Sequence, residues 1–356
     1  MSPGFRRIEQ NCAMKWHTNL RNVNCGSALK HAGLQRRITV SILLVVLEFP
    51  LAISCTASEL KHTTIEAFEH YVRVTDAHIE TELRSGRAFL WLDSLPEPQR
   101  QELYGRVRHG QLEIRQEKTQ EKGKPIEIPD GSIHHWVGVM FVSGASLKQA
   151  LSLLQDYDNH WRTYKPDVRR SKLLERNDDT FKIYLQFYKE SPRRVSFNTE
   201  FEVHYTQIDA THVISRSSSL RIAELEHPEQ PDSSEFPVGQ GRGYLWRLNN
   251  YWRLEEKDGG VYLQVETIAL SRDVPAIFAW FVNPLIRRVS RQSIATLLNA
   301  TRRGLASPER IVKKGIRLSG MPAFGRVESD EHIWDLVHFV RTLPRNANPK
   351  GEERTH

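Results

Sequence analysis

Cysteine is scarce in this chain, and its distribution is as informative as its number. Only three of the 356 residues are cysteine, at Cys12, Cys25 and Cys55. The chain after Cys55 therefore has no disulfide framework and no thiolate metal cluster. Its stability must come from core packing, which a composition of 39% hydrophobic and 26% charged residues allows.

A large charge of one sign is also lacking outside the N-terminal segment. The net charge is +7, but residues 1–54 contribute seven Lys/Arg and only two acids. The rest of the chain holds 43 bases and 41 acids, so it is nearly neutral. Nucleic-acid binding usually needs a strongly basic surface, so this balance argues against nucleic acid as a partner.

Long apolar runs are absent too, apart from the short stretch Ile38–Leu47. It follows Arg36 and Arg37, and small residues suited to signal peptidase follow it at Ala52, Ser54 and Ala57. The run is too short to predict a spanning helix. We expect residues 1–57 to be a signal or anchor region, and the protein to be exported, periplasmic or membrane-anchored. Whether the signal is cleaved, and whether residues 1–35 are a true N-terminus, stays open.

The familiar catalytic signatures are missing as well. The chain contains no GxSxG, Walker A, HExxH or dinucleotide-binding fingerprint. His134 and His135 are neighbours on an expected strand and point to opposite faces, so they predict no metal site. Four glutamates on expected strands could form an acid/base pair, but salt bridges on an outer sheet face are the stronger interpretation; they are Glu200, Glu202, Glu224 and Glu266. We assign no catalysis.

What the chain does have begins with helices. Apolar residues at helical spacing predict a helix over 63–84, ended by Gly86, and a shorter one over 96–108. The charged, Gly- and Pro-punctuated stretch Gln116–Gly131 then predicts a domain boundary. Residues 58–130 are therefore expected to be a helical extension with a linker.

A series of strands follows, each with apolar and polar residues in alternation. They are predicted at 134–142, 168–175, 181–188, 195–205, 212–224, 244–254 and 261–272, with a helix at 146–159 and a hairpin turn at Gly259-Gly260. This period predicts one antiparallel sheet with a buried face and a solvent-facing face. A long helix is expected from Pro284 to about Arg303, with an apolar stripe that includes Leu297.

This order of elements resembles the START-like superfamily, which includes polyketide cyclase and coenzyme Q-binding relatives. The phrases IHHWVGVMFVSGASLKQALSLLQDYDNHWRTYKPDVRRSKLL and YWRLEEKDGGVYLQVETIALSRDVP, with the closing helix, carry the likeness over about residues 134–304. It implies an α+β helix-grip fold for residues 131–306, a curved antiparallel sheet wrapped on a long C-terminal helix. It also implies a cavity that binds a hydrophobic small molecule or lipid without a cofactor.

Residues on the apolar strand faces and on the helix stripe are the candidates to line such a cavity. They are Phe187, Phe201, Tyr205, Trp246, Leu248, Asn250, Trp252 and Leu297. Asn250 interrupts the apolar face and could orient a ligand oxygen. Arg287, Arg288 and Arg291 either contact anionic lipid headgroups at a membrane surface or form a solvated helix face. The sequence leaves the oligomeric state open.

The C-terminal stretch GIRLSGMPAFGRVESDEHIWDLVHFVRTLP resembles the last third of a class I c-type cytochrome. The resemblance implies that Met321 is a haem axial ligand, yet the chain lacks the CxxCH that covalent haem requires. We therefore expect residues 307–356 to be a cytochrome-like remnant. Two alternatives stay open: a haem-binding electron-transfer protein completed by a partner chain, and a cyclase- or hydrolase-like enzyme that uses polar cavity residues.

Overall fold

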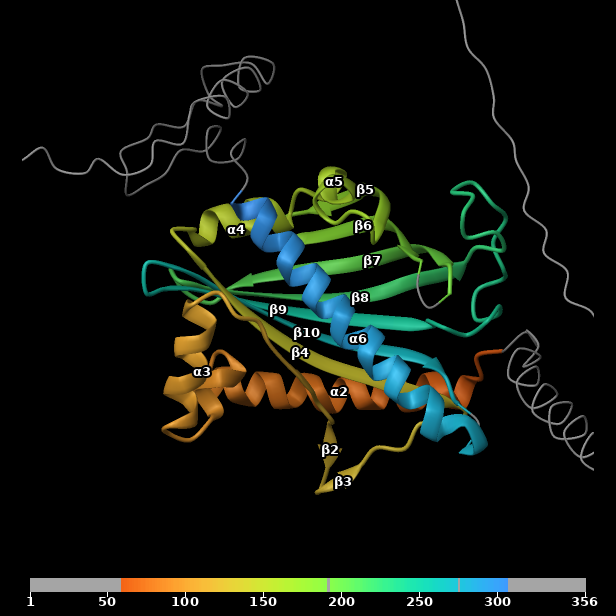
Figure 1. Cartoon of the computed structure of the whole chain (residues 1–356), viewed down its shortest axis with the longest axis horizontal. Coiled ribbons are helices and arrows are strands. Elements are labelled where there is room, and N and C mark those ends of the chain that lie inside the picture. The colour runs from red at the N-terminus through yellow and green to blue at the C-terminus, as the bar shows by residue number, and fades with distance from the viewer. Residues whose placement is uncertain (1–58, 191–192, 275, 307–356) are drawn as a thin grey trace, which may run out of the picture. The chain divides into compact units, whose positions relative to one another are not determined.

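A computed structural model describes residues 59–190, 193–274 and 276–306, and its main element is an eight-stranded antiparallel sheet (Figure 1). The strand order is β1-β4-β10-β9-β8-β7-β6-β5. The strands are β1 (Glu113–Gln116), β4 (Gly131–Ser143), β5 (Val168–Asn177), β6 (Thr180–Lys189), β7 (Val195–Gln207), β8 (His212–Glu224), β9 (Arg247–Lys257) and β10 (Gly260–Arg272).

One face of this sheet is crossed by the long helix α6 (Ala276–Leu305), which runs diagonally over the strands in Figure 1. The helix packs tightly on Gly138 of β4. A Cβ atom there would lie 2.5 Å from Ile294 Cγ2 and 2.9 Å from Leu298 Cδ1, so only glycine fits. The helices α4 (Leu147–Leu154) and α5 (His160–Thr163) and the 3₁₀ turn η2 (Tyr157–Asn159) lie beside its C-terminal half. This architecture confirms the predicted α+β helix-grip fold.

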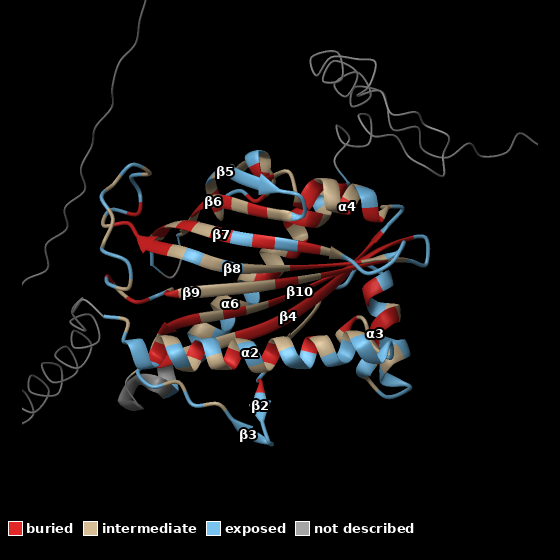
Figure 2. Cartoon of the chain, turned by 180° about the vertical axis from the view of Figure 1, so that it is seen from behind, coloured by how far each residue is buried: buried red, intermediate tan, exposed pale blue. Residues whose placement is uncertain are grey.

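The opposite face of the sheet is covered as well, which the sequence did not predict (Figure 2). The helix α2 (His62–Ser85) packs Phe68 and Tyr71 against Ile268 and Leu270 of β10. The turn η1 (Trp91–Ser94) and the helix α3 (Gln99–Arg108) cover the neighbouring part. The prediction of a solvent-facing side is therefore wrong for β4, β10 and β9. Charged residues do cover the face of β5 to β8 that α2 leaves open, as at Lys182 and Glu200.

The helical extension and the sheet share strands as well as a core. β1 lies in the predicted extension, yet it pairs with β4 from Glu113↔Val139 to Gln116↔Trp136. A separate two-stranded sheet, β2 (Gln120–Glu121) with β3 (Lys124–Pro125), occupies the predicted linker. The predicted division after residue 130 thus falls between two paired strands of one sheet.

Most predicted elements are found, with two informative shifts. The hairpin loop is Asp258-Gly259, both at positive φ, because Gly260 already pairs with Lys257. The long helix starts at Ala276, before the predicted start at Pro284, so Pro284 lies inside the helix. Within the described residues, no helix is both long and apolar enough to cross a membrane. The predicted signal and the cytochrome-like tail with Met321 lie outside the described residues.

Candidate functional site

The sheet face under α6 brings most of the predicted ligand-binding residues together. Tyr205, Ser215, Trp252 and Val265 follow one another across four adjacent strands, since each is the register partner of the next. Val203, Ser217, Asn250 and Thr267 form the next row towards the N-terminus of β4. Phe187, Phe201, Leu248 and, from α6, Leu297 belong to the same apolar cluster. We call this side of the sheet the α6 face.

One half of the α6 face is closed. Phe201 and Tyr205 are buried, and α6 buries Ile294 and Leu298 in the same cluster. The hydroxyl of Tyr205 is hydrogen-bonded to that of Tyr157 at 3.0 Å, and burial raises the Tyr205 pKa well above its ordinary value. These predicted residues are therefore core residues, with their polar atoms already used inside the protein.

The other half of the α6 face is open. Leu248, Asn250 and Trp252 of β9, with Ser217 of β8 and Thr267 of β10, are only half-buried; we call these five residues the open patch. Figure 1 shows α6 extending from its closed C-terminal half along this part of the sheet. Among the α6 side chains that the structure describes, none before Ile294 is buried. The helix and the sheet thus leave apolar surface uncovered at the same end.

The side-chain amide of Asn250 has one unused hydrogen-bond donor in the open patch. Its Oδ1 accepts a hydrogen bond from Thr267 Oγ1 at 3.0 Å, and its Nδ2 has no partner among the described residues. A half-buried amide N–H₂ in apolar surroundings is a donor for a ligand oxygen. His134, on the same face, is hydrogen-bonded to Ser271 Oγ at 2.9 Å, and burial lowers its pKa.

Trp246 is the predicted residue that the structure places elsewhere. It lies in a bend directly before β9 and packs with Phe68 and Tyr71 of α2, on the other side of the sheet. The prediction that it shares a face with Leu248 is wrong, because the two-residue period of a strand does not extend through the bend.

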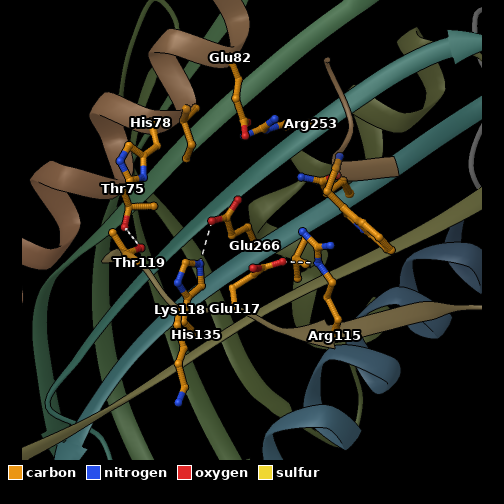
Figure 3. A pocket seen from close by; sticks show the side chains of 14 residues that line it. Thr75, His78, Glu82, Arg115, Glu117, Lys118, Thr119, His135, Arg253 and Glu266 are labelled. Carbon is orange, nitrogen blue, oxygen red and sulfur yellow. Dashed lines mark hydrogen bonds and ion pairs between the residues drawn. The ribbon is translucent and has the colours of Figure 1, made fainter. Parts of the chain in front are cut away.

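A pocket on the α2 side is the feature that sequence reasoning missed (Figure 3). It has a volume of about 140 Å³ and lies between α2, the segment 115–119 and the strands β4 and β10. Its walls are mostly polar: Thr75, His78, Glu82, Arg115, Glu117, Lys118, Thr119, His135, Arg253, Gln264 and Glu266 line it, with Ile79, Trp91 and Val137. We call it the polar pocket.

A buried hydrogen-bond chain forms one wall of the polar pocket. The Thr119 N–H donates to the Tyr71 hydroxyl at 2.8 Å, which lies 2.9 Å from His135 Nδ1. His135 Nε2 lies 2.7 Å from Glu266 Oε1. A neutral His135 with its proton on Nε2 satisfies all three bonds. Both ring nitrogens are then occupied, so His135 is not available as a general base.

Most charges of the pocket are compensated in pairs. Arg253, almost fully buried, donates to Glu82 Oε2 and to the Phe89 carbonyl, each at 2.9 Å. Burial alone would raise the pKa of Glu266, but the hydrogen bond and the electrostatic attraction from His135, with smaller contributions from Arg253 and Arg115, outweigh it, and the pKa is lowered. Glu266 is therefore ionised at neutral pH inside the protein.

The predicted salt bridges of the four glutamates are only partly found. Glu200 pairs with Lys182, Glu224 with Arg242, and Glu266 with His135. Glu202 is exposed on β7. Within the described part of the chain, no group of three His, Cys, Asp or Glu residues could hold a metal ion.

No family model matches the chain, and no curated protein does. Solved structures are similar to it. A STAR-related lipid transfer protein from Xanthomonas axonopodis is 17% identical, covers 55% of this chain and 99% of its own, with a TM-score of 0.37.

Two further structures show the same level of likeness. Human STARD10 is 12% identical over 66% of this chain and 89% of its own, with a TM-score of 0.37. The Zhui aromatase/cyclase from a Streptomyces species is 14% identical over 53% and 99%, with a TM-score of 0.31. Because these TM-scores are low, the helix-grip assignment rests on the strand order and the position of α6.

Proposed function

We propose that the chain binds a hydrophobic small molecule or lipid against the open patch, alongside the N-terminal half of α6. The proposal rests on one observation: the sheet and α6 both leave side chains incompletely buried at the same end of the α6 face. Leu248 and Trp252 are left half-buried on the sheet, while α6 has no described buried side chain before Ile294. A ligand that filled this end would bury both surfaces, and each Å² of apolar surface removed from water is worth roughly 25 cal/mol.

The polar residues of the open patch fit a ligand with one oxygen-bearing end. Asn250 Nδ2 offers a hydrogen bond without losing the one that Asn250 already makes with Thr267. No catalytic group is part of the proposal.

The outward side of α6 supports contact with a membrane surface. The helix contains five arginines and no acidic residue. Arg287, Arg288 and Arg291 are exposed, and Trp280 is 79% exposed. Tryptophan prefers the headgroup region, and arginine is attracted to anionic lipids. We include in the proposal that this surface meets an anionic bilayer from which the ligand is taken. Export, predicted from residues 36–57, would place the protein beside such a bilayer.

Ligand binding at the open patch is tested with a variant that fills the space beside it. Ala269 is the register partner of both Leu248 and His134 and is half-buried on the α6 face. Ala269→Trp should abolish the co-purification of apolar molecules, detected by native mass spectrometry and lipid extraction. Ala210→Trp, in the exposed turn between β7 and β8, is the matched control and should bind as the wild type does. No apolar ligand on the wild-type protein, or equal binding by both variants, would contradict the proposal.

Membrane contact is tested separately by sedimentation with vesicles. The wild-type protein should sediment with phosphatidylglycerol vesicles more than with phosphatidylcholine vesicles, and less at high salt. Replacing Arg287, Arg288 and Arg291 by Gln should remove that preference. The same change at Arg84, Arg100 and Arg176, which lie outside α6, should not. The open haem alternative has its own readout, since a Soret band in the purified protein would favour it.

A further inference from the structure

The polar pocket lies across the sheet from the proposed apolar site. Two polar side chains of its lining, Gln264 and Glu266, each have one atom without a hydrogen-bond partner among the described residues. Gln264 of β10 is only 1% exposed. Its Oε1 accepts a hydrogen bond from the backbone N–H of Trp91 at 2.7 Å, while its Nε2 has no partner among the described residues. This N–H₂ group is therefore a donor that an acceptor bound in the pocket can use.

Glu266 provides the complementary group on the same wall. Its Oε1 is bonded to His135, and its Oε2 has no partner within the described chain. Glu266 and Gln264 are two residues apart on one strand, so their side chains leave the same face about 7 Å apart. The pocket thus presents a negative oxygen and, within one small molecule's length, an N–H₂ donor.

A positive charge lies on the same sheet. Arg115 of β1 is the register partner of Val137 in β4, which is in turn the register partner of Glu266 in β10. Arg115 lies over the indole ring of Trp91, with its guanidinium carbon 4.1 Å from the ring centroid, and its Nε faces Glu117. The two terminal nitrogens of Arg115 have no hydrogen-bond partner in the described residues. Planar guanidinium groups held on an aromatic ring are suited to bind a carboxylate with two parallel bonds.

The size of the pocket limits its occupant to a few atoms. A cavity of about 150 Å³ accepts benzene, which has six non-hydrogen atoms, and the polar pocket has a volume of about 140 Å³. Its polar lining disfavours an apolar occupant. A simple anion would face Glu82, Glu117 and Glu266, and a simple cation would face Arg115, Lys118 and Arg253. No metal-ligand cluster is present among the described residues. A small molecule that carries both charges meets each of these conditions.

We propose that the polar pocket binds a small zwitterionic amino acid, with its ammonium group on Glu266 and its carboxylate on Gln264 Nε2 and Arg115. The ammonium supplies the donor that Glu266 Oε2 lacks, and the carboxylate supplies the acceptors that Gln264 and Arg115 lack. His78, exposed at the edge of α2, marks the mouth of the pocket. The apolar site on the α6 face takes no part in this binding.

The test compares three molecules of similar size by NMR titration of the full chain. L-Alanine has both charges, ethylamine has only the ammonium, and propionate has only the carboxylate. L-Alanine should give saturable shifts of the Gln264 side-chain amide, and each analogue should bind at least about tenfold more weakly, because a hydrogen bond to a charged group is worth about 1.5–3 kcal/mol. If L-alanine, glycine and L-serine all fail to give saturable shifts, the proposal is overturned.

Variants assign the contacts. Glu266→Gln keeps an acceptor for His135 Nε2 and should weaken L-alanine binding at least about tenfold. Arg115→Met changes a partly exposed side chain at the rim and should do the same, so a folding defect in one variant leaves the other to decide. Glu202→Gln, exposed on β7, is the matched control and should bind normally. Unchanged binding in both pocket variants would overturn the proposal.

Discussion

The two faces of the sheet are buried by different kinds of interaction. On the α6 face, apolar side chains from the strands meet Ile294 and Leu298, and polar atoms are few. On the α2 side, apolar clusters flank a network that includes Tyr71, His135 and Glu266. An apolar contact can open without leaving a polar atom unpaired, whereas each member of a buried polar network must keep its partner. The α6 face is therefore suited to admit a variable ligand, and the α2 side to hold a fixed geometry.

The largest expected effect is on the contact that closes the α6 face. Gly138→Ala puts a methyl group within 3 Å of both Ile294 and Leu298 and should lower the free energy of unfolding by about 3 kcal/mol. The control, Gly105→Ala in α3, meets no atom within 4 Å and should stabilise the protein by up to about 1 kcal/mol. Urea unfolding measures both. Equal values for the two variants would mean that α6 is not tightly seated at β4.

The next effect distinguishes the two faces directly. Tyr71→Phe leaves His135 Nδ1 and the Thr119 N–H without their partner and should cost about 2 kcal/mol. Tyr205→Phe, on the α6 face, removes one hydroxyl that pairs with Tyr157 and should cost about 1 kcal/mol. The same urea titration gives both numbers. A larger loss in Tyr205→Phe would reverse the comparison between the faces.

A smaller effect appears in acid. The pKa of Glu266 is lowered in the folded protein, so the unfolded chain binds its proton more readily. The stability that Glu266 contributes is thus present above its unfolded pKa, near 4.5, and is lost as the pH falls through the folded value. Glu266→Gln should flatten the pH dependence of unfolding below about pH 4.5. An unchanged acid limb would show that Glu266 gains nothing from His135.

The smallest effect concerns the α6 face near neutral pH. Burial lowers the pKa of His134, so the unfolded state takes up its proton first as the pH falls. Stability should therefore be constant above about pH 6.5 and decline below it. His134→Gln, which keeps a polar side chain that does not titrate, should remove part of that decline. Comparing unfolding free energies at pH 7.5 and pH 5.5 tests this, and an equal decline in both proteins would refute it.

Much of the α6 side could be predicted from the sequence because the strands there alternate strictly. Phe181, Ile183, Leu185 and Phe187 all reach the α6 face, as their spacing predicts. Asn250 was found for the same reason, as a polar residue at an apolar position. That the residues of the open patch are only half-buried could not be predicted, because this depends on the position at which α6 leaves the sheet.

The polar pocket was missed, although one signal for it existed. In β4, Trp136, Met140 and Val142 face α6, while Val137, Val139 and Phe141 face the other side. A strand that is apolar on both faces predicts a sheet covered on both sides. The pocket itself combines α2, the segment 115–119 and β10, which are far apart in the sequence. No local pattern brings Thr119, Tyr71 and Glu266 together.

A single strand separates the two proposed sites. On β10, Glu266 faces the polar pocket and its neighbour Thr267 faces the open patch, where it holds Asn250. The two ligands would therefore share one wall, one peptide unit thick. If either ligand shifts β10 or changes its mobility, the affinity of the other site changes. Thermodynamic linkage makes the two changes in affinity equal. Tenfold stronger lipid binding in the presence of the amino acid would mean tenfold stronger amino-acid binding in the presence of the lipid, a coupling of about 1.4 kcal/mol.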